Sequence, residues 1–151
     1  MPLPIDNKKD VAVGIALPLA NSNNGYFTST FTTLEQAKHN LKNLFLTRKG
    51  ERVMQPEFGT DLYNLIFEQV DDELPIAIKY SLEEAIQVWL PYLKLIKMDV
   101  ELKDDEWARD RDGVQINIST VFSLQNDPDV TESLTFSIAG GLGSNIGNVS
   151  Y

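Results

Sequence analysis

The spacing of the hydrophobic residues changes at Pro91, and this change limits the possible folds more than any other feature of the sequence. Before Pro91, hydrophobic residues recur every three or four positions, which is the period of an amphipathic helix. After Pro91 they alternate with polar residues, which is the period of a strand with one buried face. Helices followed by a run of strands are typical of the α+β class. The sequence therefore predicts a small helical layer followed by a three-stranded antiparallel meander.

Three helices are predicted in the first part of the chain. The first runs from Thr33 towards a stop near Gly50, and either Thr32 or Thr33 serves as its N-cap, because each has Glu or Gln three residues later. A short second helix begins near Thr60. The third runs from about Asp71 to Trp89, with Pro75 in its first turn. The predicted core residues of these helices are Leu34, Ala37, Leu41, Leu44, Phe45, Leu62, Leu65, Ile66, Ile78, Leu82, Ala85 and Trp89.

Three strands are predicted after Pro91. A long charged connection at 104–113 joins the first two, and a turn at 126–129 precedes the third. Each strand has one hydrophobic and one polar face. The predicted core residues are Ile96, Met98, Val100 and Leu102, then Val114, Ile116, Ile118, Phe122 and Leu124, and finally Val130, Leu134, Phe136 and Ile138. The opposite faces carry Lys97, Asp99, Glu101 and Lys103, then Asn117, Ser119 and Ser123, and finally Thr131, Ser133, Thr135 and Ser137.

A chain of 151 residues fits one α+β domain, which we expect at 33–138. Prolines and an Asn-rich stretch interrupt residues 1–32, so this part is predicted to be an extended arm. Within the arm, Val11, Val13 and Ile15 alternate as a short strand would. The Gly- and Asn-rich residues 139–151 are predicted to form a flexible tail.

The composition is acidic, with a formal net charge of −9 and a pI near 4.5. Nucleic acids and anionic membranes bind basic surfaces, so both are disfavoured as partners. No hydrophobic run approaches the roughly 18 residues of a membrane-spanning helix. The absence of cysteine excludes disulfides and thiol catalysis and is consistent with assembly in a reducing cytoplasm. The expected partner is another protein.

Neither a metal nor a cofactor is predicted. His39 is the single histidine, and it is expected on the solvated face of its helix, so histidine-based metal sites lack their usual ligands. The "ARDRDG" segment lacks the ligands of a calcium loop. The glycines of "GLGSNIG" lie four residues from the chain end rather than at the start of a helix, as a phosphate-binding loop requires.

One enzymatic alternative remains open, because glycoside hydrolysis needs only two carboxylates. Glu51, Glu57, Asp61 and Glu68 are close together in the sequence. One of such a pair must have a raised pKa in an apolar pocket. In a chain with 22 acidic residues, such proximity is also expected by chance.

The connection "LTRKGERVMQPEFGTDL", residues 46–62, has an unusual concentration of special residues. Gly50 and Gly59 permit backbone angles that a side chain forbids, Pro56 stiffens the path between them, and Phe58 anchors the loop in the core. Arg52 is expected to pair with Glu57 or with a neighbouring subunit.

Five of the 13 basic residues lie in or near this connection. They predict a charge-polarised face that docks on an acidic protein surface, with a solvated helix and turn as the alternative. The five residues are Lys38, Lys42, Arg48, Lys49 and Arg52.

The segment "LTRKGERVMQPEFGTDLYNLIFE" resembles the hallmark segment of the phage baseplate wedge family that initiates the contractile tail sheath. This family includes the equivalent baseplate subunit of type VI secretion systems. The resemblance covers Thr33 to Ile138. The matching positions are Leu46, Thr47, Gly50, Glu51, Arg52, Pro56, Phe58, Gly59, Leu62 and Phe67.

This resemblance implies a non-enzymatic structural subunit of a virion tail baseplate, present as a ring of copies and assembled in the host cytoplasm. The implied partners are baseplate wedge proteins and the tail sheath protein. Sheath arms are expected to add as strands to the small sheet, through the strands that carry Ile96, Met98 and Val100 or Leu134, Phe136 and Ile138. The expected wedge-docking residues are Arg48, Lys49, Glu51, Arg52, Leu90, Pro91 and Tyr92.

The sequence departs from the family pattern after the third predicted helix. Many members carry Glu-Pro-Arg there, a motif implicated in seating the subunit on the wedge, whereas this chain has Leu90, Pro91 and Tyr92. Both charges are lost, so an apolar and aromatic contact would have to replace charge-assisted docking, and simple helix-end packing is the alternative. The family also carries an old label as a lysozyme. A peptidoglycan-cleaving muramidase and a tail adaptor without sheath contact therefore remain alternative functions.

Overall fold

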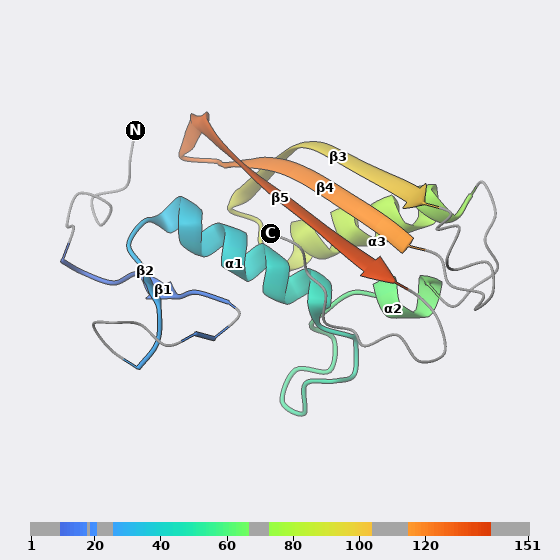
Figure 1. Cartoon of the computed structure of the whole chain (residues 1–151), viewed down its shortest axis with the longest axis horizontal. Helices are drawn as coiled ribbons and strands as arrows, with labels where there is room; N and C mark the ends of the chain where they lie inside the picture. Colours follow the sequence, from blue (N-terminus) through green and yellow to red (C-terminus); the bar gives the residue numbers. More distant parts are fainter. Residues whose placement is uncertain (1–9, 18, 21–25, 67–72, 104–114, 140–151) are drawn as a thin grey trace.

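A computed structural model describes residues 10–17, 19–20, 26–66, 73–103 and 115–139. Figure 1 shows a three-stranded sheet with α1 and α3 against one face, and a smaller two-stranded ribbon at the opposite end of α1 from α2. This arrangement confirms the predicted α+β class. The elements are β1 (Gly14–Ile15), β2 (Ser29–Thr30), α1 (Thr33–Leu46), α2 (Leu62–Leu65), α3 (Leu74–Trp89), β3 (Leu93–Lys103), β4 (Gln115–Leu124) and β5 (Asp127–Ala139).

Helix α1 is capped by Thr32, the first of the two predicted candidates. The Thr32 hydroxyl accepts a hydrogen bond from the Glu35 amide at 3.2 Å, and the Glu35 carboxylate accepts one from the Phe31 amide at 3.2 Å. The first bond satisfies a donor that the first helical turn leaves free, and the second ties the residue before the N-cap to the helix. The helix ends at Leu46, four residues before the predicted stop at Gly50, because Thr47 adopts an extended backbone and bonds to Thr60 instead.

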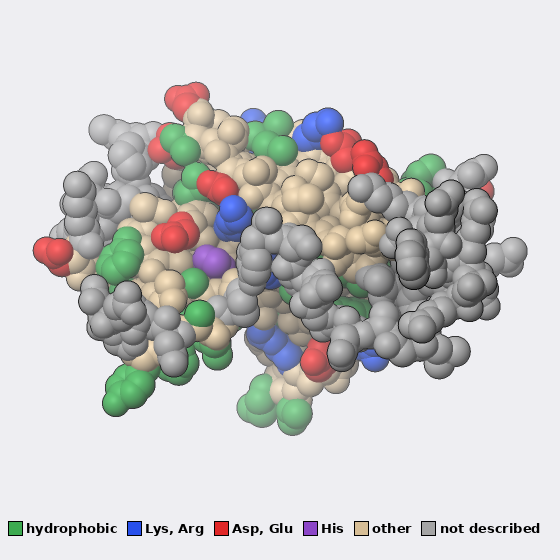
Figure 2. Space-filling view, viewed as in Figure 1, with side chains coloured by type: hydrophobic (Ala, Val, Ile, Leu, Met, Phe, Trp, Pro, Cys, Tyr) green, Lys and Arg blue, Asp and Glu red, His purple; other side chains and the backbone are tan. Residues whose placement is uncertain are grey.

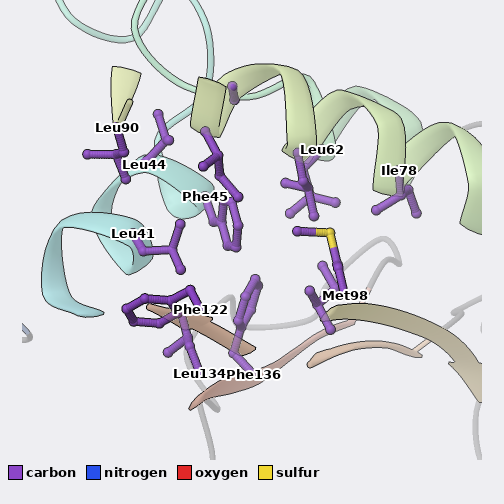
Figure 3. Packing of buried hydrophobic residues seen from close by; sticks show 14 of the residues in the cluster. Leu41, Leu44, Phe45, Leu62, Ile78, Leu90, Met98, Phe122, Leu134 and Phe136 are labelled. Atoms are coloured by element: carbon purple, nitrogen blue, oxygen red, sulfur yellow. The ribbon is translucent and has the colours of Figure 1, made fainter. Parts of the chain in front are cut away.

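The hydrophobic core lies between the two long helices and the inner face of the sheet (Figure 3). The rings of Phe45 on α1 and Phe136 on β5 pack with centroids 5.7 Å apart. Helix α3 contributes Ile78, Leu82 and Ala85, as predicted, and Met98 on β3 faces them across the core. Each fully buried large side chain of this kind contributes roughly 1.5–3 kcal/mol by leaving water.

Helices α2 and α3 begin close to the predicted positions. Asp61 precedes α2, whose Leu62 is fully buried, and Pro75 lies in the first turn of α3. Proline is favoured there because the first helical amides have no partner within the helix. The predicted start of the third helix at Asp71 lies outside the described residues.

The three long strands are antiparallel in the order β3-β4-β5, which confirms the meander. The central strand β4 alternates regularly, with Ile116, Ile118 and Phe122 buried. Both β3 and β5 are edge strands within the described part of the chain, so each has one side whose backbone groups do not pair with the sheet.

Two predicted core residues are wrong, because bulges interrupt the alternation in both edge strands. Ile96 is 51% exposed, since the register shifts between Leu95 and Lys97. Val130 is 49% exposed, since Ser123 pairs with Thr131 while Leu124 pairs with Asp127, and the residues 128–130 leave the regular ladder. Leu93 and Leu95 take the place of Ile96 on the inner face of β3.

The end of β4 also differs from the prediction. Ser123 was expected on the polar outer face, but it is fully buried, and its hydroxyl has no hydrogen-bond partner within the described residues. The predicted turn at 126–129 is a tighter turn at Gln125 and Asn126, so Pro128 lies inside β5. An edge strand tolerates proline, because an amide on its outer side has no ladder partner to lose. The predicted core residue Val114 lies outside the described residues.

The arm folds back on itself and onto α1. Gly14 pairs with Thr30 in the antiparallel β1–β2 ribbon, and the Thr30 hydroxyl donates a hydrogen bond to the Gln36 side chain at 2.6 Å. A side chain at Gly14 would overlap that of Gln36, so glycine permits this close approach. The half-buried His39 was expected to be solvated, but its Nδ1 lies 3.0 Å from the Leu17 amide nitrogen.

No helix in the described ranges has the length and apolarity needed to cross a membrane.

We predict that Phe136→Ala lowers the free energy of unfolding by about 3–5 kcal/mol, because it leaves a cavity against Phe45. The matched control is Val130→Ala, which removes an exposed side chain from the same strand and should change stability by less than about 0.5 kcal/mol. Urea unfolding monitored by circular dichroism measures both values. Equal losses in the two variants would contradict this assignment of the core.

Candidate functional site

The connection between α1 and α2, which we term the α1–α2 loop (residues 47–61), is closed at its base by hydrogen bonds. The Thr60 amide donates to the Thr47 carbonyl at 2.9 Å, and the Lys49 amide donates to the Thr60 carbonyl at 3.3 Å. The buried Thr60 hydroxyl donates to the carbonyl of Phe45 at 3.1 Å. These bonds join the two ends of the loop to the last turn of α1, so the loop leaves the helical layer in a fixed direction.

Two glycines shape the loop, as predicted, but for different reasons. Gly50 has φ of 86° and open space around its Cα, so it is required only for its backbone angle. Gly59 has φ of 121°, and a Cβ there would also overlap the carbonyl oxygen of Thr47. Gly59 therefore permits both the backbone conformation and the closure of the base.

The outer part of the loop is also held by its own backbone. The Gly50 amide donates to the Pro56 carbonyl at 2.7 Å, and the Gln55 amide donates to the Arg52 carbonyl at 3.2 Å. At the tip, Val53 and Met54 are 94% and 91% exposed. Figure 2 shows hydrophobic side chains on the lowest projection of this face, where Figure 1 places the loop. An ordered loop therefore presents two apolar side chains to solvent.

Phe58 anchors the loop against the end of α3. Its ring packs edge-on against the Trp89 ring, with centroids 5.1 Å apart. The Arg52 guanidinium carbon lies 3.9 Å from the centroid of the Phe58 ring, in cation–π geometry. The expected pairing of Arg52 with Glu57 is not among the ion pairs of the described residues. Arg52 stabilises the loop from within instead.

The basic residues near the loop do not gather on one free cationic face. Lys38 forms an ion pair with Glu132 on β5 at 2.9 Å, and Lys42 is buried. Lys49 pairs with Asp61 at 2.5 Å, and this hydrogen bond raises the pKa of the Lys49 amine. Both side chains of that pair are about two-fifths exposed, so it contributes little to stability.

Arg48 is different, because its guanidinium carbon lies 5.0 Å from the ring centroid of Tyr63 and it has no ion pair with a carboxylate among the described residues. The nearby Glu51 carboxylate instead accepts a hydrogen bond from the Arg48 backbone amide at 3.1 Å. Burial, and then the charge of Glu51, raise the pKa of the Tyr63 hydroxyl, while Arg48 lowers it.

The sequence analysis did not predict a role for Tyr63, Val53 or Met54. The sequence does contain a signal for Val53 and Met54, because they are two adjacent apolar residues in a charged segment between Gly50 and Pro56.

The segment Leu90, Pro91 and Tyr92 lies at the corner between α3 and β3. Leu90 packs in the core, whereas Pro91 and Tyr92 are exposed. The Gln125 side chain donates to the Pro91 carbonyl at 2.5 Å, and the Gln125 amide donates to the Tyr92 carbonyl at 3.0 Å. The Tyr92 hydroxyl accepts a hydrogen bond from Asn40 at 3.0 Å. Leu90 is therefore a structural residue, and Pro91 and Tyr92 remain the candidates for partner contact at this corner.

A chain of side-chain hydrogen bonds links this corner to the arm. Asn40 accepts from Gln36 at 2.9 Å, and Gln36 accepts from Thr30 at 2.6 Å. Together with the Asn40–Tyr92 bond, these contacts connect the β1–β2 ribbon, α1 and the start of β3. Tyr92, at a position where the resemblance led us to expect a charge, is thus an uncharged and internally bonded side chain.

Most side chains of the predicted strand-pairing set face the core. Met98, Leu134, Phe136 and Ile138 are buried, and Val100 is partly buried against them. A strand that pairs with either edge would therefore meet backbone groups and the outer-face side chains. Ile96, at the bulge in β3, is the exposed member of the set.

Among the described residues, the carboxylates Glu51, Glu57 and Asp61 do not form the pair in an apolar pocket that glycoside hydrolysis needs. Asp61 is ion-paired with Lys49, Glu51 accepts from a backbone amide, and Glu57 is exposed. Glu68 lies outside the described residues. Within the described ranges, no group of three or more His, Cys, Asp or Glu side chains is placed to hold a metal ion.

We predict that Gly59→Ala destabilises the protein more than Gly50→Ala. Gly50→Ala should lower the free energy of unfolding by about 1–2 kcal/mol, because only the positive φ opposes a side chain there. The Gly59 variant must also displace the Thr47 carbonyl and break the base of the loop, so its cost should exceed that of Gly50→Ala. Thermal unfolding measures the difference, and an equal or smaller loss in Gly59→Ala would show that the loop base relaxes freely.

Comparison with known proteins identifies relatives of the chain. A curated relative, the baseplate wedge protein gp25 of Enterobacteria phage T4, is 26% identical over 106 residues, which cover 70% of this chain and 75% of the relative. A solved structure described as a putative tail lysozyme from Geobacter sulfurreducens has a TM-score of 0.56 at 19% identity, covering 73% of this chain and 91% of that chain.

A second solved structure, a chain of the anti-feeding prophage baseplate, has a TM-score of 0.51 at 24% identity. The match covers 82% of this chain and 81% of that chain. At these identities, both structures show a shared fold. The model of the family described as baseplate wedge protein gp25 matches residues 33–140, and this match includes the α1–α2 loop and all three strands of the sheet. The chain therefore belongs to the family of baseplate wedge protein gp25.

Proposed function

We propose that this chain is a non-enzymatic structural subunit of the baseplate of a contractile phage tail. We further propose that it templates sheath polymerisation by accepting a strand of the sheath protein at the free edge of β5. Family membership supports the baseplate role. The observation that carries the templating role is the uncharged edge of β5 from Ser133 to Ala139.

The two edges of the sheet differ in their protection against strand addition. Along β3 the outer face carries Lys97, Asp99 and Glu101, and a bulge interrupts the strand before Lys97. Charged side chains and bulges are the usual means by which proteins block edge-to-edge pairing. This edge is therefore a poor template.

From Ser133 to Ala139 the β5 edge has neither kind of protection, because the last charged residue of the strand is Glu132. From Thr131 to Ala139 the register with β4 is unbroken. The outer face carries Thr131, Ser133, Thr135 and Ser137, which are polar but uncharged. An incoming strand satisfies the free N–H and C=O groups of such an edge, and alternate side chains set its register. Within the described residues, no other strand pairs with this edge.

A muramidase is the first alternative, and one of the solved structures is described as a putative tail lysozyme. That likeness is one of fold. A retaining or inverting glycosidase needs one protonated carboxyl in an apolar pocket opposite an ionised one. Asp61, paired with Lys49, and the exposed Glu57 do not provide that environment.

A tail adaptor without sheath contact is the second alternative, and assembly separates it from a sheath initiator. Baseplates are prepared with and without this chain and mixed with the purified sheath protein of the same tail. If the chain templates polymerisation, electron microscopy should show sheath growing only from baseplates that contain it. Sheath growth of normal length and frequency from baseplates that lack the chain would rule out the templating role.

We predict that sheath protein slows hydrogen exchange at the β5 edge. In an antiparallel edge strand, alternate residues direct their amides away from the sheet, so about half of the amides in 131–138 should exchange rapidly in the isolated chain. Addition of sheath protein should protect these amides and leave those of β3 unchanged, as measured by NMR. Protection at β3 instead would show that the template is the edge of β3 and not that of β5. Protection at neither strand would exclude strand addition.

We also predict that the purified protein does not release soluble fragments from peptidoglycan. The assay uses hen egg-white lysozyme as the positive control and Glu57→Gln and Asp61→Asn as variants. Turnover by the wild type that is lost in either variant would establish the muramidase function instead.

A further inference from the structure

A pocket of about 540 Å³ lies at the base of the α1–α2 loop. Its chemical character is mixed, because one aliphatic and one aromatic side chain line it together with two cations and one carboxylate. The lining residues are Leu46, Arg48, Lys49, Gly50, Glu51 and Tyr63. None of the interactions described above explains why the loop forms this pocket.

The charges around the pocket leave one guanidinium available. Lys49 is paired with Asp61, and Arg52 is not among the residues that line the pocket. Arg48 contacts the Tyr63 ring, and within the described residues it has no ion pair with a carboxylate. The Glu51 carboxylate is engaged by the backbone amide of Arg48. The free donors of Arg48 therefore suit a carboxylate from outside the chain, which a guanidinium binds with two parallel hydrogen bonds.

The tip of the same loop adds an apolar contact. Val53 and Met54 are almost fully exposed, and the backbone bonds between Gly50 and Pro56 and between Arg52 and Gln55 hold the chain that carries them. Binding by an ordered loop loses little backbone entropy, so most of the burial energy of the two side chains is available for affinity. Methionine also adapts its shape to an irregular apolar surface.

We propose that the α1–α2 loop is a docking element for a protein partner that presents a carboxylate beside an apolar depression. Arg48 binds the carboxylate in the pocket at the base of the loop, and Val53 and Met54 enter the depression. This inference rests on the proposed function, and it assigns the loop to the partner in the baseplate wedge rather than to the sheath.

Protein is favoured over nucleic acid as this partner. A nucleic acid strand presents a row of phosphates and needs several unpaired cations along one groove. This chain has a net charge of −9, and Lys49 is paired with Asp61, which leaves two arginines in the loop without an ion pair among the described residues. The apolar tip also has no role in contacting a phosphate backbone.

The position of the loop is compatible with two partners at once. In Figure 1 the loop projects from the helical layer on the side away from the three-stranded sheet. A wedge protein on the loop and a sheath strand on β5 would therefore contact different sides of the chain.

The test measures binding of the full chain to wedge complexes of the same tail that were assembled without it. Biolayer interferometry should give an affinity about tenfold weaker for Arg48→Gln, and also about tenfold weaker for the double variant Val53→Ser with Met54→Ser. The matched controls are Lys94→Gln and Val130→Ser, which change an exposed cation and an exposed apolar residue elsewhere, and both should bind as the wild type does. Because these side chains are exposed, thermal unfolding should confirm that all variants remain folded.

Salt provides a second readout of the charged contact. Raising KCl from about 0.1 M to about 0.5 M shortens the screening length and should weaken wild-type binding more than that of Arg48→Gln. Wild-type binding together with unchanged affinity in the loop variants would overturn the docking role of the loop and leave the baseplate role intact. A failure of the wild type to bind the wedge would overturn both. Binding that nuclease treatment abolishes would identify nucleic acid as the ligand and contradict the proposal.

Discussion

Burial of the inner face of the sheet beneath α1 and α3 is the constraint on which the other features of this chain depend. Phe45, Phe136 and Met98 meet in that layer, and their packing fixes the helices relative to the strands. Because the inner face is buried, a partner can contact the sheet only at its edges and its outer face. The same layer fixes the end of α1 and the end of α3, between which the α1–α2 loop is anchored.

The order of the helices and strands could be predicted from the sequence, because it follows from hydrophobic periodicity alone. The exceptions occur where the chain is locally irregular. Ile96 and Val130 fit the alternation in the sequence, but each lies within a bulge, where the alternation of side-chain directions is broken, and the sequence pattern contains no sign of the extra residues. Ser123 is buried beside the second bulge for a related reason. Periodicity describes a regular strand and cannot locate an interruption.

The loop was predictable in outline and not in its contacts. Gly50, Gly59 and Phe58 have the predicted roles, since each follows from the properties of one residue type. The residue that Arg52 contacts could not be predicted from the sequence. Phe58 and Glu57 are both near it in the sequence, and only the path of the backbone decides between them. Likewise, the bond between Asn40 and Tyr92 joins residues from distant parts of the sequence, which no local pattern connects.

The contact between the arm and His39 can form with either neutral tautomer of the imidazole ring. The Nδ1 atom lies 3.0 Å from the Leu17 amide nitrogen and 3.1 Å from the Leu17 carbonyl oxygen. A neutral ring with a bare Nδ1 accepts a hydrogen bond from the amide, whereas a neutral ring that carries its proton on Nδ1 donates one to the carbonyl. Either tautomer thus retains a bond to Leu17, so attachment of the arm to α1 does not require the ring proton to be on one particular nitrogen.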